Sequence, residues 1–209
     1  YVDKVSKGII PPVITAEYKG QYNVIKTNLN NVVKMMSDLL TQTDIIIKAA
    51  AEGELKKRAD ADKFVGGWNQ LVKGVNDTIT NIVNPLNVTA TYVDRISKGD
   101  IPPKITDQYS GDYNIIKNNL NACIDAVNFM VADAAMLSKA AVDGKLATRA
   151  DASRHQGDFR KIVAGVNDTL DAVIGPLNVA AKYVDEISKG AIPAKITDTY
   201  NGDFNTLKN

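Results

Sequence analysis

Apolar or small residues recur along residues 21–51 in alternating steps of three and four. They fall at Ile25, Leu29, Val32, Met36, Leu39, Thr43, Ile46 and Ala50. This spacing puts one stripe of side chains on one side of an α-helix and is typical of the a and d positions of a coiled coil. The pattern therefore predicts a single helix over residues 21–51, about 45 Å long, with a narrow apolar seam.

A second and less regular seam follows at Trp68, Leu71, Val75, Ile82 and Ile96. Pro85 interrupts this seam, and Pro176 occupies the equivalent place in a later repeat. Because proline has no N–H group and its ring clashes with the preceding helical turn, we expect a kink or a fresh helix start at both prolines.

The chain repeats itself with a period of 91 residues, since residues 92–118 and 183–209 agree at 19 of 27 positions without a gap. Glycines and asparagines spaced alternately by 45 and 46 residues divide each period in two. We expect five units of two alternating kinds, at residues 1–36, 37–82, 83–127, 128–173 and 174–209. The first unit lacks most of its first helix and the last most of its second, which favours an excerpt of a longer array with three complete units.

Each unit contains a connector that begins at an opening glycine and finishes at a closing glycine 12 or 13 residues later. Two apolar positions follow the opening glycine at offsets of two and six residues. The opening glycines with their two apolar positions are Gly8, Ile10, Ile14; Gly53, Leu55, Ala59; Gly99, Ile101, Ile105; Gly144, Leu146, Ala150; and Gly190, Ile192, Ile196. We expect the glycine to end its helix in a left-handed cap and both apolar side chains to pack into the groove between two helices.

A connector of this length can span up to about 40 Å when extended, which is enough to run back along a helix of about 15 residues. The two helices of a unit can therefore be parallel. Two parallel helices with one stripe each cannot bury that stripe alone. We thus predict an all-α fold in which a homodimer forms one parallel four-helix bundle per unit, with the units stacked into a rod.

The two kinds of connector differ in their apolar positions. First-kind connectors carry isoleucine at both positions together with proline, as in Ile101, Pro102 and Ile105, whereas second-kind connectors carry leucine and alanine, as in Leu146 and Ala150. Replacing isoleucine by alanine removes about 2–3 kcal/mol of possible burial. We expect the two kinds of unit to prefer different bundle geometries, and their shared helices to couple these preferences.

The connectors resemble those of the HAMP domain, the helical relay module of chemoreceptors and sensor histidine kinases. The resemblance rests on the Gly-x-apolar-x-x-x-apolar run at residues 99–105 and on the second-helix pattern at residues 111–121, which finishes in apolar-Asn. The family's Asp-Glu-x-Gly helix opening falls on Gly111-Asp112-Tyr113-Asn114, where only one carboxylate remains, as in divergent tandem HAMP arrays. The resemblance implies a parallel homodimer that passes a conformational signal along its helices.

The resemblance also implies a function. The chain is expected to be a cytoplasmic signal-relay segment of a methyl-accepting chemotaxis protein, whether or not the parent is membrane-anchored. It would act on an output domain in the same parent chain and, through it, on a chemotaxis kinase and adaptor. Two alternatives stay open: the HAMP array of a sensor histidine kinase, and a structural spacer or filament.

Composition adds exclusions. The 209 residues carry 25 Lys and Arg against 24 Asp and Glu and are 44% hydrophobic, which argues against a nucleic-acid binder and a disordered chain. The longest apolar runs, such as residues 45–47, are far shorter than the roughly 20 residues of a membrane span, so the segment is expected to be soluble. No catalytic motif, phosphate loop or metal-ligand spacing is present. We therefore expect no enzyme activity, cofactor, metal or small-molecule ligand.

Three sets of side chains need an interpretation. The single histidine, His155, lies at the end of a connector and is interpreted as a solvated or capping residue, because a metal site needs further ligands. The lone Cys123 is interpreted as a small side chain on or near a packed face in a reducing compartment. Five aromatic residues share one equivalent position and are interpreted as core packing: Tyr22, Trp68, Tyr113, Phe159 and Phe204.

Overall fold

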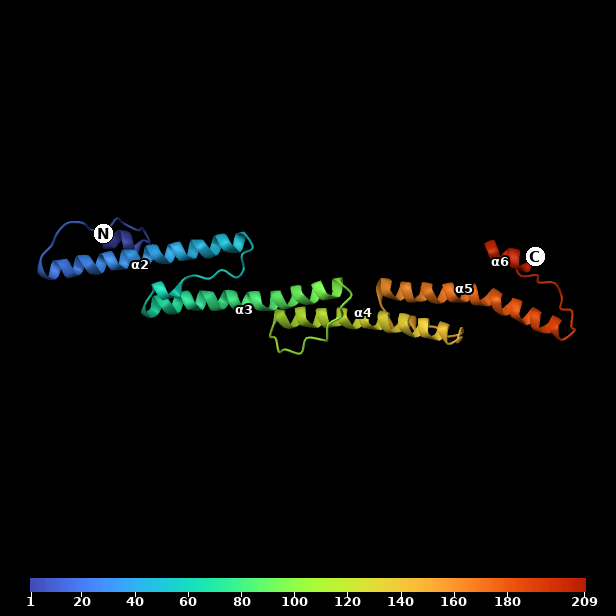
Figure 1. Ribbon diagram of the computed structural model, residues 1–209. Helices are drawn as coiled ribbons and strands as arrows, with labels where there is room; N and C mark the ends of the chain where they lie inside the picture. Colours follow the sequence, from blue (N-terminus) through green and yellow to red (C-terminus); the bar gives the residue numbers. More distant parts are fainter. The chain divides into compact units, whose positions relative to one another are not determined.

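The computed structural model describes all 209 residues and is all-α, with 69% of the residues in helices and no strand. The α-helices are α1 (Val2–Ser6), α2 (Gly20–Ala51), α3 (Gly66–Ser97), α4 (Asp112–Val142), α5 (Gly157–Ser188) and α6 (Gly202–Lys208), and two 3₁₀ turns are η1 (Ala61–Lys63) and η2 (Ala152–Arg154) (Figure 1). The all-α prediction is confirmed. The helix predicted over residues 21–51 is α2, to within one residue.

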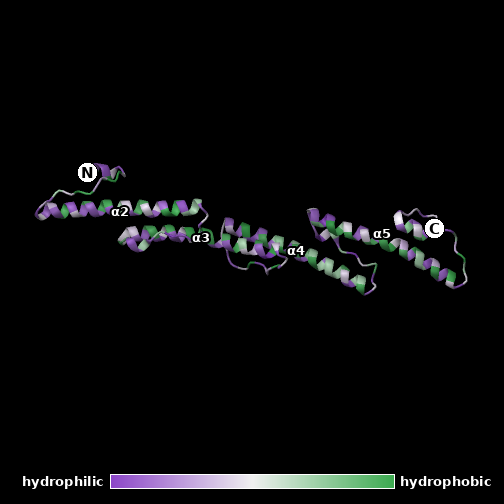
Figure 2. Cartoon of the chain, turned by 45° about the horizontal axis from the view of Figure 1, so that its top comes forward, coloured by the Kyte–Doolittle hydropathy of each residue, from purple (hydrophilic) through white to green (hydrophobic).

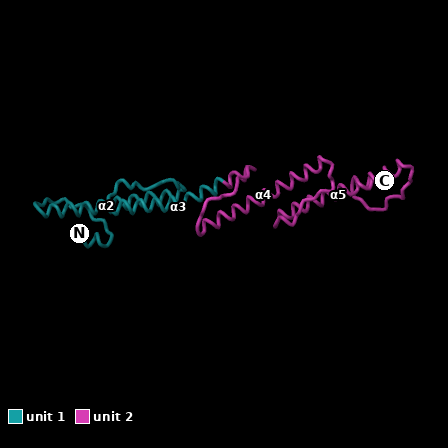
Figure 3. The backbone as a smooth tube through the Cα atoms, turned by 90° about the horizontal axis from the view of Figure 1, so that it is seen from below, with its two compact units in different colours: residues 1–91 teal, residues 92–209 magenta.

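The chain divides into two compact units, residues 1–91 and 92–209 (Figure 3). The division falls inside α3. The finer division into five repeats stays a prediction.

Within residues 1–91, α2 and α3 run in the same direction. The connector after α2 doubles back along that helix. The Asp60 N–H donates to the side chain of Gln42 at 2.8 Å, and Gln42 lies nine residues before the end of α2. The chain then turns forward into α3, where Asn76 meets Ala59 of the same connector. The parallel arrangement of α2 and α3, with the connector lying back along them, is visible in Figure 1. The prediction that a unit can hold two parallel helices is confirmed here.

The apolar seam of the helices is only partly covered within the chain. In α2 the buried residues are Val33, Gln42 and Ala49, whereas the seam residues Ile25 and Val32 are exposed. Along every long helix, hydrophobic residues alternate with hydrophilic ones (Figure 2). The connector therefore covers a flank of the helix, and half of the predicted seam positions of α2 stay exposed, the other half being half-buried.

Both internal prolines lie inside continuous helices. α3 runs through Pro85 and α5 through Pro176. Of the two expected outcomes, a kink or a fresh helix start, the fresh start does not occur. One proline removes only one i to i−4 hydrogen bond from a helix, and the remaining bonds of these 32-residue helices hold them together. α5 bends along its length (Figure 1).

By length and composition alone, α4 is the one helix that could cross a membrane, with a mean hydropathy of 1.4 over 18 residues. The short apolar runs did not predict this, because α4 reaches its hydropathy through alanine and other apolar residues spread among polar ones. α4 also carries Asp125 and Asp133, which both pair with connector side chains.

Candidate signalling connector

The opening glycine ends each first helix in a Schellman cap. At Gly99, with φ of +77°, the Gly99 N–H donates to the Ile96 carbonyl and the Asp100 N–H donates to the Arg95 carbonyl, both at 3.0 Å. This pair of bonds satisfies carbonyls that the helix end would otherwise leave free. The same two bonds are made at Gly8, Gly53, Gly144 and Gly190 and the residue after each.

The two glycine sets are the ten residues of the chain with positive φ. The closing glycine Gly111, with φ of +56°, stands immediately before α4, where the connector turns into the second helix. A Cβ added at Gly99 or Gly111 would have open space around it. The requirement for glycine is therefore conformational, since residues with a side chain rarely adopt this region.

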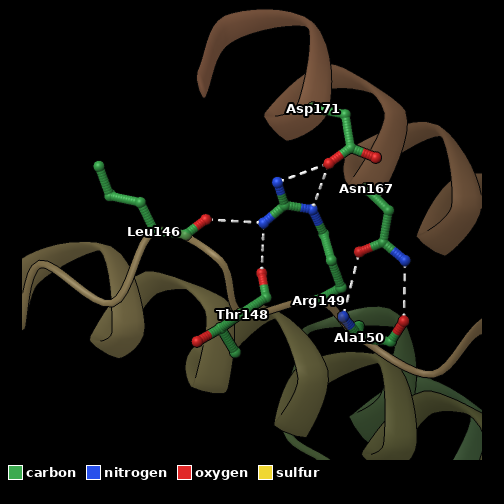
Figure 4. Close-up of polar contacts among 6 residues, drawn as sticks. All are labelled: Leu146, Thr148, Arg149, Ala150, Asn167 and Asp171. Atoms are coloured by element: carbon green, nitrogen blue, oxygen red, sulfur yellow. Dashed lines mark hydrogen bonds and ion pairs between the residues drawn. The ribbon is translucent and has the colours of Figure 1, made fainter. Parts of the chain in front are cut away.

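In the middle of the connector, one asparagine holds both main-chain polar groups of the second apolar position. Asn167 of α5 accepts a hydrogen bond from the Ala150 N–H (3.0 Å) and donates one to the Ala150 carbonyl (2.8 Å) (Figure 4). We call this pair of bonds the asparagine clamp. It recurs as Asn30 on Ile14, Asn76 on Ala59 and Asn121 on Ile105.

The sequence analysis used the spacing of these asparagines to divide the repeat but did not predict that they bind the connector. An extended segment has no ladder partner for its N–H and C=O groups, and buried backbone groups need partners. A side-chain amide supplies one acceptor and donors from a single residue. An asparagine 16 or 17 residues after each second apolar position was the signal that could have identified the clamp.

A basic side chain provides a second tie between the connector and its second helix. Arg149 donates to the carbonyls of Leu146 and Thr148 (2.8 and 2.6 Å) and to Asp171 of α5 (2.6 and 2.9 Å) (Figure 4). Arg58 makes the equivalent bonds to Leu55, Lys57 and Thr80, and Lys104 pairs with Asp125 at 2.7 Å. Asp171 is exposed, and exposed ion pairs contribute only about 0–1 kcal/mol. This tie therefore orients the connector more than it stabilises it.

Charge also fixes the cap after α3. Arg95 donates to both carboxylate oxygens of Asp100, at 2.6 and 3.1 Å. The hydrogen bond from Arg95 lowers the pKa of Asp100, and the positive charge of Arg95 lowers it further. At the other two first-kind connectors, the positions of Arg95 and Asp100 are taken by Lys4 and Ile9 and by Glu186 and Ala191. Neither pair can form this ion pair, which therefore belongs to one connector alone.

The two apolar positions differ in burial. At the second position Ala59, Ile105 and Ala150 are buried, and Ile14 and Ile196 are half-buried. At the first position Ile10 and Ile101 are half-buried, Leu55 and Leu146 are exposed, and Ile192 is 96% exposed. The chain by itself thus encloses the second position most fully, and the packing role of the whole set stays a prediction.

Second-kind connectors replace the lost isoleucine with a ring. Phe64 and His155, five residues after Ala59 and Ala150, are buried, at 3% and 5% exposure. In first-kind connectors the equivalent Tyr18 is 49% exposed and Tyr109 is only half-buried. Phe64, Ala59 and Val72 form one buried cluster. The expected loss of burial in second-kind units is therefore offset, because a ring fills the space beside the alanine.

His155 is buried, so its interpretation as a solvated residue was wrong. Its Nε2 atom lies 2.6 Å from Oδ2 of Asp133, and the two side chains are 1% and 10% exposed. Nearby, Asp151 begins η2 and accepts from both the N–H and the hydroxyl of Ser153 (2.9 and 2.6 Å). The hydroxyl bond lowers the pKa of Asp151 most, followed by the backbone bond, with smaller contributions from the charges of Arg154 and His155.

The other interpreted residues are not enclosed by their own chain. Tyr22, Trp68 and Phe159 are exposed, and Tyr113 and Phe204 are half-buried. Cys123 is exposed rather than packed. No group of three or more His, Cys, Asp or Glu side chains is placed to hold a metal ion.

The sequence profile of the HAMP domain matches residues 1–38, 63–129 and 154–209, well over half of the chain. The chain belongs to the HAMP domain family. HAMP domains relay signals within sensor proteins and are linkers rather than catalytic domains. No solved structure matches this chain.

The matched segments contain all three first-kind connectors, and the unmatched residues 39–62 and 130–153 contain most of the two second-kind connectors. The unmatched stretches nevertheless fold in the same way. Gly53 and Gly144 form the same cap, and Ala59 and Ala150 are held by the same asparagine clamp. Second-kind connectors thus keep the HAMP connector geometry with a divergent sequence.

Proposed function

We propose that this chain is the cytoplasmic relay of a methyl-accepting chemotaxis protein and works as a parallel homodimer. In each unit, two copies of the chain form a four-helix bundle, and a change of helix packing at one end is passed to an output domain in the same parent chain. A chemotaxis kinase and its adaptor would read that output. The observation that carries the proposal is the uncovered seam of the two long helices in residues 1–91.

The seam on α3 exposes large apolar side chains at heptad spacing. Leu71, Val75 and Ile82 are 50%, 43% and 48% exposed. Beside them a groove of about 380 Å³ runs between α2 and α3 and is lined mainly by apolar residues of both helices and by Ala59 of the connector. A continuous apolar stripe left open on a polar helix marks an interaction surface.

A second copy of the chain fits this surface better than an unrelated partner. Heptad seams pack against heptad seams, and a two-fold interface brings the same patch of both copies together. Since α2 and α3 are parallel within one chain, a parallel partner adds two more helices in the same direction and completes a four-helix bundle. The aromatic residues Tyr22, Trp68 and Phe159, which their own chain leaves exposed, lie near the starts of α2, α3 and α5 respectively.

The alternation of connectors supports a relay over a passive spacer. Both kinds use the same caps and the same asparagine clamp, yet they fill the core differently, with isoleucine at Ile105 and with alanine plus a ring at Ala59 and Phe64. A spacer has no need for two core designs. Two designs joined by shared helices give neighbouring units that bias each other, which is what a two-state relay requires.

Single cysteines test the dimer. In a Cys123→Ser background, Val75→Cys should form a disulfide-linked dimer under mild oxidation, because a parallel two-fold axis brings the two copies of residue 75 together. Asp77→Cys, two residues away on α3, is the matched control and should cross-link far less. Equal cross-linking of both variants would contradict the proposed dimer. So would a monomer at tens of micromolar in a sedimentation experiment.

A hybrid receptor tests the relay and its class. The chain is inserted between a chemoreceptor sensor and its signalling hairpin, or between the same sensor and a histidine kinase core. We expect stimulus-dependent control of the chemotaxis kinase, and Ala59→Ile with Ala150→Ile should lock that output. Control of the histidine kinase core alone would favour the sensor kinase alternative. Stimulus control that is indifferent to both substitutions would favour a spacer.

A further inference from the structure

We infer that the buried pair of His155 and Asp133 is a proton-dependent anchor, which makes the connector of residues 144–157 sensitive to pH while the equivalent connector of residues 53–66 is not. The inference concerns the fold of one unit and stands apart from the choice of receptor, kinase or spacer.

The two second-kind connectors are anchored to their first helix by different atoms. In residues 1–91, Gln42 of α2 accepts from the main-chain N–H of Asp60, and Phe64 is buried in a cluster with Ala59 and Val72. In residues 92–209, the equivalent helix residue is Asp133, which pairs instead with the His155 side chain at 2.6 Å. One anchor is thus an uncharged amide and a phenyl ring, and the other is two ionisable groups.

The ionisable anchor is enclosed. The His155 side chain is 1% exposed and that of Asp133 is 10% exposed, so their contact is shielded from most of the solvent. A buried ion pair is tolerated because its charges cancel, and removing one charge leaves the other uncompensated at a large cost. The charge state of this pair therefore acts directly on how firmly the connector is held to α4.

Charged groups lie around the imidazole on both elements that hold it. On α4, Asp133 and Asp125 are acidic, and Asp125 lines the same pocket of about 260 Å³ as His155 and is paired with Lys104. On the connector, the charges of Arg154 and His155 both lower the pKa of Asp151, and Arg154 is held over the Phe129 ring at 4.8 Å. The α5 residue that lines the pocket is uncharged.

The sign of the effect follows from these charges. An imidazole is positively charged when protonated and uncharged when it is not. While His155 is protonated, it donates a charge-assisted hydrogen bond to the Asp133 carboxylate, and the buried pair is neutral overall. As the pH rises and the proton leaves, the carboxylate of Asp133 remains as a net negative charge in a buried site. We therefore expect the anchor to loosen as the pH rises.

The chain contains its own reference for the measurement. The clamped amides Ala59 N–H and Ala150 N–H stand in the same sequence context, Arg-Ala-Asp, and each donates to the side chain of an asparagine. Their unprotected exchange rates are therefore alike at any pH. The ratio of their hydrogen-exchange rates, measured by NMR, reports the difference in local opening between the two connectors.

We expect Ala150 to exchange faster relative to Ala59 by about tenfold between about pH 6 and about pH 8.5, which is the order of change when a charge-assisted bond becomes an ordinary one. Because His155 is the only histidine, imidazole ¹⁵N shifts give its charge state over the same range without assignment ambiguity. A ratio that stays constant while the imidazole changes charge would overturn the proposal. So would an imidazole that keeps one charge state throughout.

The matched variant replaces the anchor with that of the other unit, as His155→Phe with Asp133→Gln. Its Ala150 to Ala59 ratio should not change with pH, and the same pH dependence in this variant would also overturn the proposal. If the double variant does not fold, the converse exchange, Gln42→Asp with Phe64→His, serves instead. It should make the Ala59 amide pH-dependent in the same direction, and its failure to do so would count against the anchor.

Discussion

At the scale of single residues, the connector is held by side chains that replace a missing strand partner. An extended segment between two helices would otherwise leave its N–H and C=O groups unpaired where the helices cover it. Asn121 satisfies both groups of Ile105, at 2.8 and 3.0 Å, from one position on α4. The clamp thus fixes the register between connector and helix at the residue whose side chain is buried.

Asn121→Ala should therefore destabilise the fold by about 1–3 kcal/mol, because it leaves two partly buried main-chain groups without partners. Chemical denaturation followed by circular dichroism measures the effect. Asn119→Ala on the same helix is the matched control, since Asn119 is exposed, and it should change the stability by less than about 0.5 kcal/mol. Equal losses in the two variants would mean that the clamp contributes nothing beyond helix propensity.

At the scale of elements, the sequence predicts what depends on local periodicity. The seam predicts α2 to within one residue, and the spaced glycines mark the end of one helix and the beginning of the next, because both depend on residues that are neighbours along the chain. The resemblance at residues 99–121 predicts the family.

The contacts between elements were harder to foresee. His155 and Asp133 are 22 residues apart on different elements, so nothing local distinguishes a buried histidine from a solvated one. The ring of Phe64 that fills the space beside Ala59 is likewise visible only when the connector lies against α3. Pro176 was expected to bring a kink or a fresh helix start, and α5 continues through it because a single lost bond is small against the rest of the helix.

A glycine with positive φ and a glycine inside a helix should respond in opposite ways to substitution by alanine. Gly99 has φ of +77° and open space around its Cα, so Gly99→Ala should cost about 1–2 kcal/mol for the left-handed conformation alone. Gly74 lies inside α3, also with open space around it, so Gly74→Ala should stabilise by up to about 1 kcal/mol through helix propensity. Thermal unfolding of both variants checks the signs, and a stabilising Gly99→Ala would refute the conformational requirement.

At the scale of the whole molecule, the chain alternates two solutions to one packing problem. Where the second apolar position is large, as at Ile105, the following ring stays partly in solvent, as at Tyr109. Where that position is small, as at Ala59, the ring of Phe64 is buried instead. Interiors are close-packed, so side chains that share a space must change together. The alternation is therefore a property of residue pairs rather than of single sites.

This pairing predicts a non-additive response in a double-mutant cycle. Ala59→Ile should destabilise by about 1–3 kcal/mol, because the larger side chain meets the buried Phe64 and Val72. Phe64→Tyr should also destabilise, because it buries a hydroxyl without a partner. The double variant carries the residue types of a first-kind pair, isoleucine and tyrosine, in a connector that is one residue longer, and we expect its ring to turn toward solvent. Its loss should be smaller than the sum of the single losses by about 1 kcal/mol or more.

A distant ring supplies the control for the cycle. Phe159→Tyr changes an exposed ring in the other compact unit, and combined with Ala59→Ile it should give additive losses, since separated sites add within about 0.5 kcal/mol. If Ala59→Ile is equally additive with Phe64→Tyr, the two residues do not share one space and the pairing is wrong. If the coupling is found, a folded chain with a second-kind unit converted to the first kind becomes available. The hybrid receptor can then show whether the order of unit kinds sets the output, free of the overpacking that Ala59→Ile causes alone.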